Sequence, residues 1–230
     1  MSRPRLLDLF CCEGGAAVGY DRAGFEVVGV DLGGRFKKRY PFEFHQGDAI
    51  EFVKEHGHEF DAIHASPPCQ RYSITNAARK HDYPDLVGPT RDALKASGKP
   101  YVIENVVGAP LEDPVMLCWT QFSTPGSVED DDGTPLQMFR HRLFESNVRL
   151  PQLLCNHEPG MQVAGSYGGA RKDKHEARHV RHGGYVPSKR VQQALLGINW
   201  MTLHGMYQSI PPVYAYVVGS SLRRHLEVTG

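Results

Sequence analysis

Residues 5–15, Arg-Leu-Leu-Asp-Leu-Phe-Cys-Cys-Glu-Gly-Gly, decide the fold. The apolar run over residues 5–10 has the length and composition of a buried strand. Gly14 and Gly15 then permit a tight turn, and residues 15–23 are predicted to form a helix that ends at Gly24. A strand, a glycine turn and a helix in this order open a βαβ unit.

The same alternation continues along the next ninety residues. Strands are predicted at residues 26–31, 60–65 and 101–104, and helices at 49–56 and at about 85–97. Gly88-Pro89 should break the start of the second of these helices. Strands that alternate with helices predict an α/β domain with a mostly parallel sheet and right-handed crossovers.

The regular pattern ends after Pro110. Residues 155–188 have almost no apolar periodicity and are predicted to form a loop-rich insert. Helices are expected again at residues 191–196 and at about 213–226, the last starting after Pro211-Pro212. This divides the chain into a first catalytic part (residues 1–146), a small recognition region (147–188) and C-terminal helices that complete the domain (189–230).

The charges are balanced overall but unevenly distributed. The chain has 26 Lys and Arg against 26 Asp and Glu, so it is not a uniformly basic protein. Residues 171–190 contain seven basic and two acidic side chains, which is typical either of a solvated loop or of a nucleic-acid contact. The acidic run at residues 129–132 is interpreted as a solvated loop.

The cysteines and the apolar runs point to a soluble intracellular protein. Five cysteines are an odd number, and Cys11 and Cys12 are adjacent, which favours reduced thiols over a disulfide framework. No apolar run approaches the roughly 18 residues of a membrane span, and the N-terminus does not resemble a signal peptide. We therefore expect a cytoplasmic enzyme without a membrane partner.

Cys69 is the strongest candidate for a nucleophile. It follows Pro67-Pro68 at the carboxyl end of a predicted strand, where ligands bind in open α/β sheets. Two successive prolines make the loop rigid. A free thiol has a pKa of about 8.5, so Cys69 would need activation at neutral pH.

Other polar side chains lie at corresponding positions. Glu104 ends the next strand and could act as a general acid beside Cys69. Arg140 and Arg142 alternate, so that in a strand both would point to one face as a donor pair for phosphate or a base carbonyl. Asp31 ends the second strand, where an acid can bind ribose hydroxyls. Asp48 could lie beside an adenine or cap a helix.

These motifs, taken in order, closely resemble the C5-cytosine DNA methyltransferases. The motifs are DLFxxxGG at Asp8–Gly15, the acid Asp31, PPCQxxS at Pro67–Ser73, ENV at Glu104–Val106, RxR at Arg140–Arg142 and QSIPP at Gln208–Pro212. The resemblance implies a Rossmann-like S-adenosylmethionine-dependent methyltransferase fold with a small loop-rich target-recognition insert. It also implies methyl transfer to C5 of a flipped-out cytosine through a covalent adduct between Cys69 and C6, with S-adenosylhomocysteine as product.

The resemblance assigns the site residue by residue. The expected catalytic residues are Cys69, Glu104, Arg142, Arg140 and Gln70. The expected cofactor-binding residues are Phe10, Cys12, Glu13, Gly14, Gly15, Asp31, Leu32, Asp48, Ala49, Pro67, Gln208 and Ser209. The expected DNA-binding residues are Arg71, Ser73, Arg171, Lys172, Lys174, Arg178 and Arg181, which makes the basic segment the DNA contact. No metal-binding residue is expected.

The sequence departs from the family at two places. Cys12 and Glu13 occupy the turn that usually reads Gly-x-Gly-Gly, and Glu13 is expected to receive the ammonium group of the cofactor. The recognition region has room for only about 45 residues, as in compact phage or prophage enzymes, which predicts a short target in double-stranded DNA. We expect a monomer, and a cognate restriction nuclease is a possible partner.

Four alternatives remain open. The first is an RNA cytosine methyltransferase, although the Cys-Phe-Thr signature of tRNA-modifying relatives is absent. The second is a non-catalytic DNA-binding relative, and the third transfers a modified group from a related sulfonium. The fourth is a zinc protein, either a protease through the HExxH pattern at His175 and His179 or a structural site that uses Cys155, His157 and these histidines.

Overall fold

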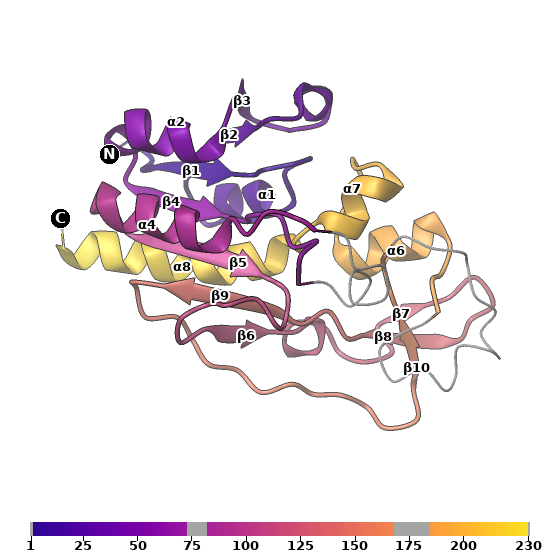
Figure 1. Cartoon of the computed structure of the whole chain (residues 1–230). Coiled ribbons are helices and arrows are strands. Elements are labelled where there is room, and N and C mark those ends of the chain that lie inside the picture. Colours follow the sequence, from indigo (N-terminus) through magenta and orange to yellow (C-terminus); the bar gives the residue numbers. More distant parts are fainter. Residues whose placement is uncertain (1, 73–81, 168–184, 230) are drawn as a thin grey trace.

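The computed structural model describes residues 2–72, 82–167 and 185–229. Its main element is a seven-stranded sheet in the order β3-β2-β1-β4-β5-β9-β6 (Figure 1). The strands are β1 (Arg5–Leu9), β2 (Glu26–Asp31), β3 (Glu43–Gln46), β4 (Ala62–Ala65), β5 (Tyr101–Asn105), β6 (Val115–Leu117) and β9 (Arg142–Ser146). The first five strands of the order pair in parallel, and β9 and β6 complete the sheet in antiparallel pairings.

Helices cover both faces of this sheet. The helices are α1 (Gly15–Arg22), α2 (Ala49–His56), α4 (Val87–Ser97), α6 (Lys189–Leu196), α7 (Leu203–Gln208) and α8 (Pro212–Thr229). Short 3-10 turns occur at η1 (Gly34–Lys38), η2 (Gly57–Glu59) and η3 (Trp119–Gln121). Helices α1 and α8 pack together on one face, and α2 and α4 pack on the other.

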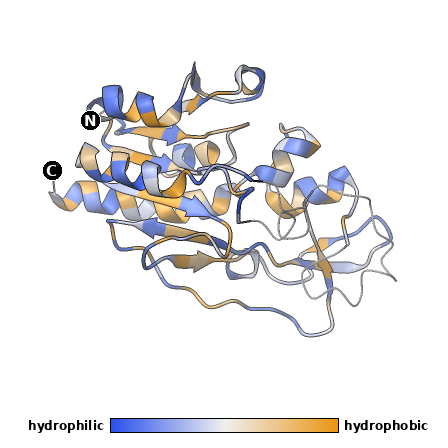
Figure 2. Cartoon of the chain, viewed as in Figure 1, coloured by the Kyte–Doolittle hydropathy of each residue, from blue (hydrophilic) through white to orange (hydrophobic). Residues whose placement is uncertain are grey.

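Two apolar cores result from the alternation of side chains along the strands. Leu6 and Val102 face α1 and α8, whereas their neighbours Leu7 and Ile103 face α2 and α4. Because both faces are covered, the central strands are almost continuously apolar, and their hydropathy contrasts with the mixed colours of the surface helices (Figure 2). The prediction of a mostly parallel α/β sheet is confirmed.

Three local predictions differ from the structure. Strand β3 and helix α7 were not predicted, since β3 is short and polar and α7 has only one and a half turns of weak pattern. Helix α4 begins at Val87 and runs through Gly88-Pro89 without a break. Pro89 lies in the first turn of the helix, where its missing N–H has no helical acceptor in any case.

A second, three-stranded sheet lies beyond the β6 edge and has the order β10-β8-β7. It comprises β7 (Val128–Glu129), β8 (Pro135–Met138) and β10 (Gln162–Ala164). Its core contains Trp119, whose indole donates to the Leu195 carbonyl at 2.6 Å, together with residues of α6 and α7. Strand β8, which the sequence analysis placed in the first catalytic part, therefore pairs with β10 of the recognition region across the expected boundary at 147.

Among the described residues, no helix is both long and apolar enough to cross a membrane.

Candidate active site

The loop after β4 presents Cys69 at the carboxyl edge of the sheet. It leaves the sheet at Ser66, whose N–H donates to the Leu9 carbonyl at 3.1 Å. The amide of Asn105 donates to the Pro67 carbonyl at 3.0 Å and so ties the loop to the end of β5. The two prolines and this buried bond hold the thiol beside the neighbouring strand ends.

Glu104 and Arg142 form an ion pair beside this loop. Glu104 lies on β5 next to β4, and only 6% of its surface is exposed. The Nε of Arg142 lies 3.0 Å from Oε1 of Glu104. Arg142 is the first residue of β9, and because β9 runs antiparallel to β5, its first residue lies at the edge where the parallel strands end.

The two charges act on Cys69 in opposite directions. Burial raises the pKa of the Cys69 thiol, Arg142 lowers it and Glu104 raises it, with a net upward shift. The pKa of Glu104 is itself raised by burial, although Arg142 and a hydrogen bond from Ser66 oppose this shift. Both pKa shifts are upward, and a raised pKa suits a carboxyl that acts as an acid.

A chain of buried hydrogen bonds supports Glu104 from behind. The Tyr20 hydroxyl lies 2.8 Å from Nδ1 of His64, and Nε2 of His64 lies 2.8 Å from the Ser66 hydroxyl. Ser66 in turn bonds to the Glu104 carboxylate. Burial lowers the pKa of His64 to about 3, so that its ring is neutral and carries a single proton.

The sequence placed Ser66 in the nucleophile loop but indicated no role for Ser66, His64 or Tyr20. The available signal was a histidine within the apolar strand before Pro67-Pro68, since a buried polar side chain needs partners.

Arg140 differs in position from the prediction. It precedes β9 instead of lying in the strand, and its buried guanidinium donates to main-chain carbonyls. The acceptors are Ser166 at 3.0 Å, Met206 at 3.4 Å, Tyr207 at 3.1 Å and Ser209 at 2.5 Å. Arg140 thus clamps the segment after α7 onto the start of β9, and the expected pair of arginines on one strand face is not formed.

The turn between β1 and α1 adopts an unusual backbone. Phe10, Cys12 and Gly14 have φ angles of 59°, 47° and 82°. Positive φ is costly for side chains other than glycine, and such strain clusters where a ligand must approach the backbone. The value at Cys12 also explains why the family uses glycine there. A Cβ on Gly14 would lie 2.7 Å from Cδ of Pro41, so the turn is closely packed.

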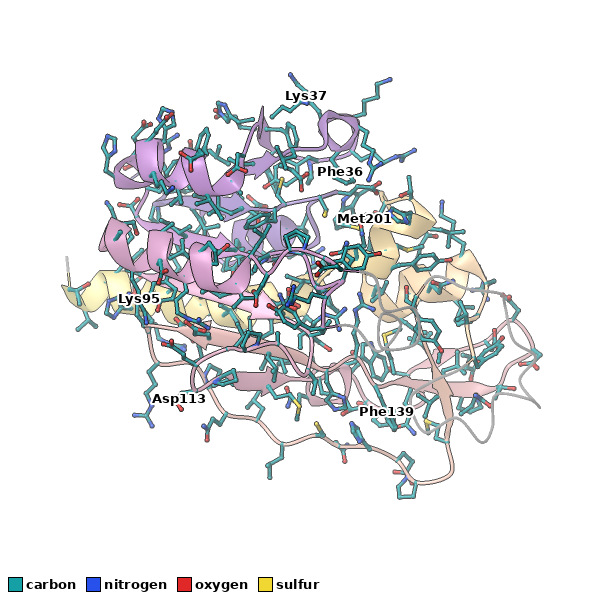
Figure 3. All side chains as sticks on the ribbon, in the orientation of Figure 1. Phe36, Lys37, Lys95, Asp113, Phe139 and Met201 are labelled. Carbon is teal, nitrogen blue, oxygen red and sulfur yellow. The ribbon has the colours of Figure 1, made fainter. Side chains whose placement is uncertain are left out.

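Asp31 closes this turn from the end of β2. Its carboxylate accepts the Cys12 N–H at 3.0 Å and the Gly33 N–H at 2.8 Å. The next residue, Leu32, is 68% exposed and offers an apolar surface at the same edge. Phe36 and Lys37 follow on η1 above this edge (Figure 3).

Asp48 and Ala49 lie at the start of α2. The Asp48 side chain accepts the N–H groups of Ile50 and Glu51 at 2.8 and 3.0 Å, so it caps the helix, while Ala49 is buried. Asp48 therefore caps helix α2, which is one of the two roles that the sequence left open.

Glu13 has partners other than those expected. Its two carboxylate oxygens accept the N–H and the hydroxyl of Thr202, both at 2.7 Å, and its carbonyl accepts the Trp200 indole at 2.9 Å. The side chain is buried against Gly205, where a Cβ would lie 2.3 Å from Oε2. Glu13 thus holds the start of α7 through its carboxylate, and its contact with a cofactor ammonium group stays a prediction.

The last motif meets the first turn in space. A Cβ on Gly15 would lie 2.5 Å from the Ile210 carbonyl and 3.1 Å from Cβ of Ser209. Gln208 is exposed beside this contact, and the hydroxyl of Ser209 donates to the Met206 carbonyl at 2.9 Å. The chain therefore brings Gly15 and residues 209–210 together.

Few of the predicted DNA-binding residues can be placed. Arg71 is exposed and donates to the Tyr83 carbonyl at 2.7 Å, and Gln70 is half-buried next to Cys69. Ser73, the basic residues of the insert from Arg171 to Arg181 and the HExxH pattern lie outside the described residues.

The fold and this edge define a class of protein. A mostly parallel sheet with the glycine turn, the strand-end acid Asp31 and the polar cluster at one edge is the arrangement of the Rossmann-like, S-adenosylmethionine-dependent methyltransferases. Residues 4–107 match the family described as C-5 cytosine-specific DNA methylase, so the resemblance found in the sequence is confirmed over this part of the chain.

The match includes Cys69 and Glu104 but ends before Arg142 and the last motif. These residues are therefore similar to the methyltransferases of the cytosine-C5 class, which use S-adenosylmethionine. No curated protein matches the sequence.

Solved structures with the same fold cover almost the whole chain. One, described as a DNA modification methyltransferase encoded within a prophage (E. coli), is 14% identical with a TM-score of 0.61 and covers 97% of this chain and 99% of its own. The S. pombe Dnmt2 methyltransferase is 12% identical with a TM-score of 0.60, again over 97% and 99%. The Entamoeba histolytica methyltransferase EhMeth is 12% identical with a TM-score of 0.55, over 98% and 99%. At these identities the likeness concerns the fold.

Proposed function

We propose that the protein is a DNA cytosine-C5 methyltransferase in which Cys69 is the covalent nucleophile. The observation that carries this proposal is the convergence of Cys69, Glu104 and Arg142 at one sheet edge, with the Glu104–Arg142 pair at 3.0 Å. A base that enters this site meets a thiol, a carboxyl with a raised pKa and a cation together.

The residues around the first turn fit the cofactor. The turn between β1 and α1 has positive φ angles at Phe10, Cys12 and Gly14, which let a ligand approach the main chain. The first N–H groups of α1 and the carboxylate of Asp31 lie beside this turn. Leu32 is placed for an adenine face and Asp31 for the ribose hydroxyls. S-adenosylmethionine supplies the electrophilic methyl group when it is bound.

Each catalytic residue has a separate task. The Cys69 thiol gives its proton to solvent as the sulfur adds to C6 of a flipped-out cytosine, while Glu104 protonates or hydrogen-bonds N3, so that electron density reaches C5. After C5 has gained the methyl group, it loses its proton to solvent and the bond between C6 and sulfur breaks. Arg142 holds Glu104 and the base or its sugar-phosphate, and Arg140 positions the segment that bears Gln208 and Ser209.

A trapping experiment tests the mechanism. The protein is incubated with S-adenosylmethionine and duplex DNA that carries 5-fluorocytosine, which cannot lose its C5 substituent. We expect an adduct that survives denaturation, and its absence with Cys69→Ala. No adduct with the wild-type protein, or an adduct that persists in Cys69→Ala, refutes the covalent role of Cys69.

A second experiment tests the substrate. Labelled methyl transfer to duplex DNA, single-stranded DNA and transfer RNA is compared under the same conditions. We expect incorporation into duplex DNA, at a short target because the recognition region is small. Preferential labelling of RNA would mean that the enzyme acts on RNA by the same mechanism. A mass increase of the product larger than that of one methyl group would indicate a modified sulfonium cofactor.

A further inference from the structure

Four side chains that take no part in the catalytic cluster converge below β9. They are Cys118, His141, Cys155 and His157, and each offers one ligand atom within 4.8 Å of every other. Sγ of Cys118 lies 3.4 Å from Nε2 of His157, and Sγ of Cys155 lies 3.6 Å from Nε2 of His141. The atoms thus form a compact group of two sulfurs and two imidazole nitrogens.

These separations match a tetrahedral zinc site. With Zn–S bonds of about 2.3 Å and Zn–N bonds of about 2.0–2.1 Å, the ligand atoms of a regular tetrahedron lie about 3.3–3.8 Å apart. Two thiolates and two imidazoles are a common ligand set of structural zinc, and soft sulfur ligands disfavour magnesium and calcium. A disulfide would use the two sulfurs alone, and it would leave unexplained why each sulfur faces an imidazole nitrogen.

The ligands come from three separate segments of the chain. Cys118 directly follows β6, His141 lies between β8 and β9, and Cys155 and His157 belong to the coil between β9 and β10. The ring of His157 stacks on Phe139 with centroids 4.0 Å apart and an interplanar angle of 24°. Phe139, at the end of β8, marks the place of the group (Figure 3).

We propose that Cys118, His141, Cys155 and His157 bind a structural Zn²⁺ ion. The ion would tie the long coil after β9 to the main sheet, because that coil contains neither strand nor helix from Asn147 to Met161. It would also hold the peptide next to the active site, since Arg142 donates from Nη1 to the His141 carbonyl at 3.0 Å. The zinc thus links the recognition region to the residue that pairs with Glu104.

This site differs from the one considered from the sequence. Cys155 and His157 were singled out there, but with the histidines at 175–182, which lie outside the described residues. The tertiary structure supplies Cys118 and His141 in their place. The proposal is independent of the methylation substrate, because metal content is measured without any reaction.

Metal analysis of the untagged full-length protein is the direct test. We expect one zinc ion per chain after purification from zinc-containing medium, and its loss in the double variant Cys118→Ser, Cys155→Ser. Cys69→Ser is a matched control that removes a thiol elsewhere, and His58→Ala removes an exposed histidine. Both controls are expected to keep the full metal content. Replacement of zinc by Co²⁺ should give the visible bands of a tetrahedral site with thiolate charge transfer.

Three outcomes would overturn the proposal. One is wild-type protein that contains no zinc and shows no tetrahedral spectrum on titration with Co²⁺. Another is full metal content in the double variant, which would place the ion elsewhere. The third is a disulfide between Cys118 and Cys155 in protein denatured without reductant. If the double variant does not fold, X-ray absorption of the zinc-bound wild type decides, because two sulfur and two nitrogen neighbours are required.

Discussion

The Nε of Arg142 lies 3.0 Å from Oε1 of Glu104, and this pair joins the antiparallel strand β9 to the parallel strand β5 beside Cys69. The carboxylate is almost fully buried, so removal of either partner would leave the other in a poorly solvated place. Arg142 therefore compensates the charge of a carboxylate that is buried at the edge of the sheet.

The Glu104→Gln variant tests the acid. The amide is similar in shape but cannot donate the same proton to N3, and general acid catalysis is worth about 10²–10⁴-fold in rate. We expect a loss of kcat of this order with an unchanged affinity for S-adenosylmethionine. Single-turnover methylation and calorimetric binding of the cofactor measure the two quantities. A variant with wild-type kcat would remove Glu104 from the mechanism.

Ser66→Ala tests the chain behind Glu104. The Ser66 hydroxyl stabilises the ionised carboxyl, so its loss raises the pKa of Glu104 further. If Glu104 acts as an acid, the alkaline limb of the pH–kcat profile should move to higher pH. Ser220→Ala, which removes a hydroxyl bonded only within α8, is the control. An alkaline limb that stays in place or moves to lower pH in Ser66→Ala would contradict the role of the chain.

Asp8 makes the stability depend on pH. Burial raises the pKa of Asp8 from 3.8 to about 8, although the Tyr40 hydroxyl donates to it at 3.1 Å. The folded state therefore binds the extra proton, and the stability that this group contributes is lost as pH rises from about 4 through about 8. Asp8→Asn should flatten this part of the profile and be the more stable protein at alkaline pH. Urea unfolding across this range measures it, and identical profiles would contradict the shift.

Glu13→Gln separates a structural role from cofactor binding. Thr202 donates two hydrogen bonds to the Glu13 carboxylate, and a glutamine would turn its NH₂ group toward one of these donors. We expect a loss of about 1–3 kcal/mol in unfolding free energy, with little change in the affinity for S-adenosylmethionine. Asp31→Ala should weaken cofactor binding, and it should also lower stability because it removes the acceptor of the Cys12 and Gly33 N–H groups. Thermal unfolding measures the stability of the two variants, and titration measures their affinity for the cofactor. A stable Glu13→Gln variant that binds the cofactor weakly would indicate that Glu13 contacts its ammonium group.

Much of the first half of the fold could be predicted because its signals are local. The apolar runs, the glycine turn and the cap at Asp48 depend on neighbours in the sequence, and the corresponding elements lie within a few residues of their predicted bounds. Beyond Pro110 the strands are short, and their pairing with distant residues decides their existence. Strand β8, for example, pairs with both β7 and β10.

The sequence alone determined which chemical groups are present and where the parallel strands end. It therefore placed Cys69 and Glu104 at a common edge, since parallel strands that alternate with helices share their carboxyl edge. The tertiary structure decided the rest. The antiparallel direction of β9 brings Arg142 to Glu104. Long-range packing places Glu13 where it accepts hydrogen bonds from Thr202, and Arg140 where it donates to the carbonyls after α7. The meeting of Cys118, His141, Cys155 and His157 depends in the same way on chain directions that local sequence does not encode.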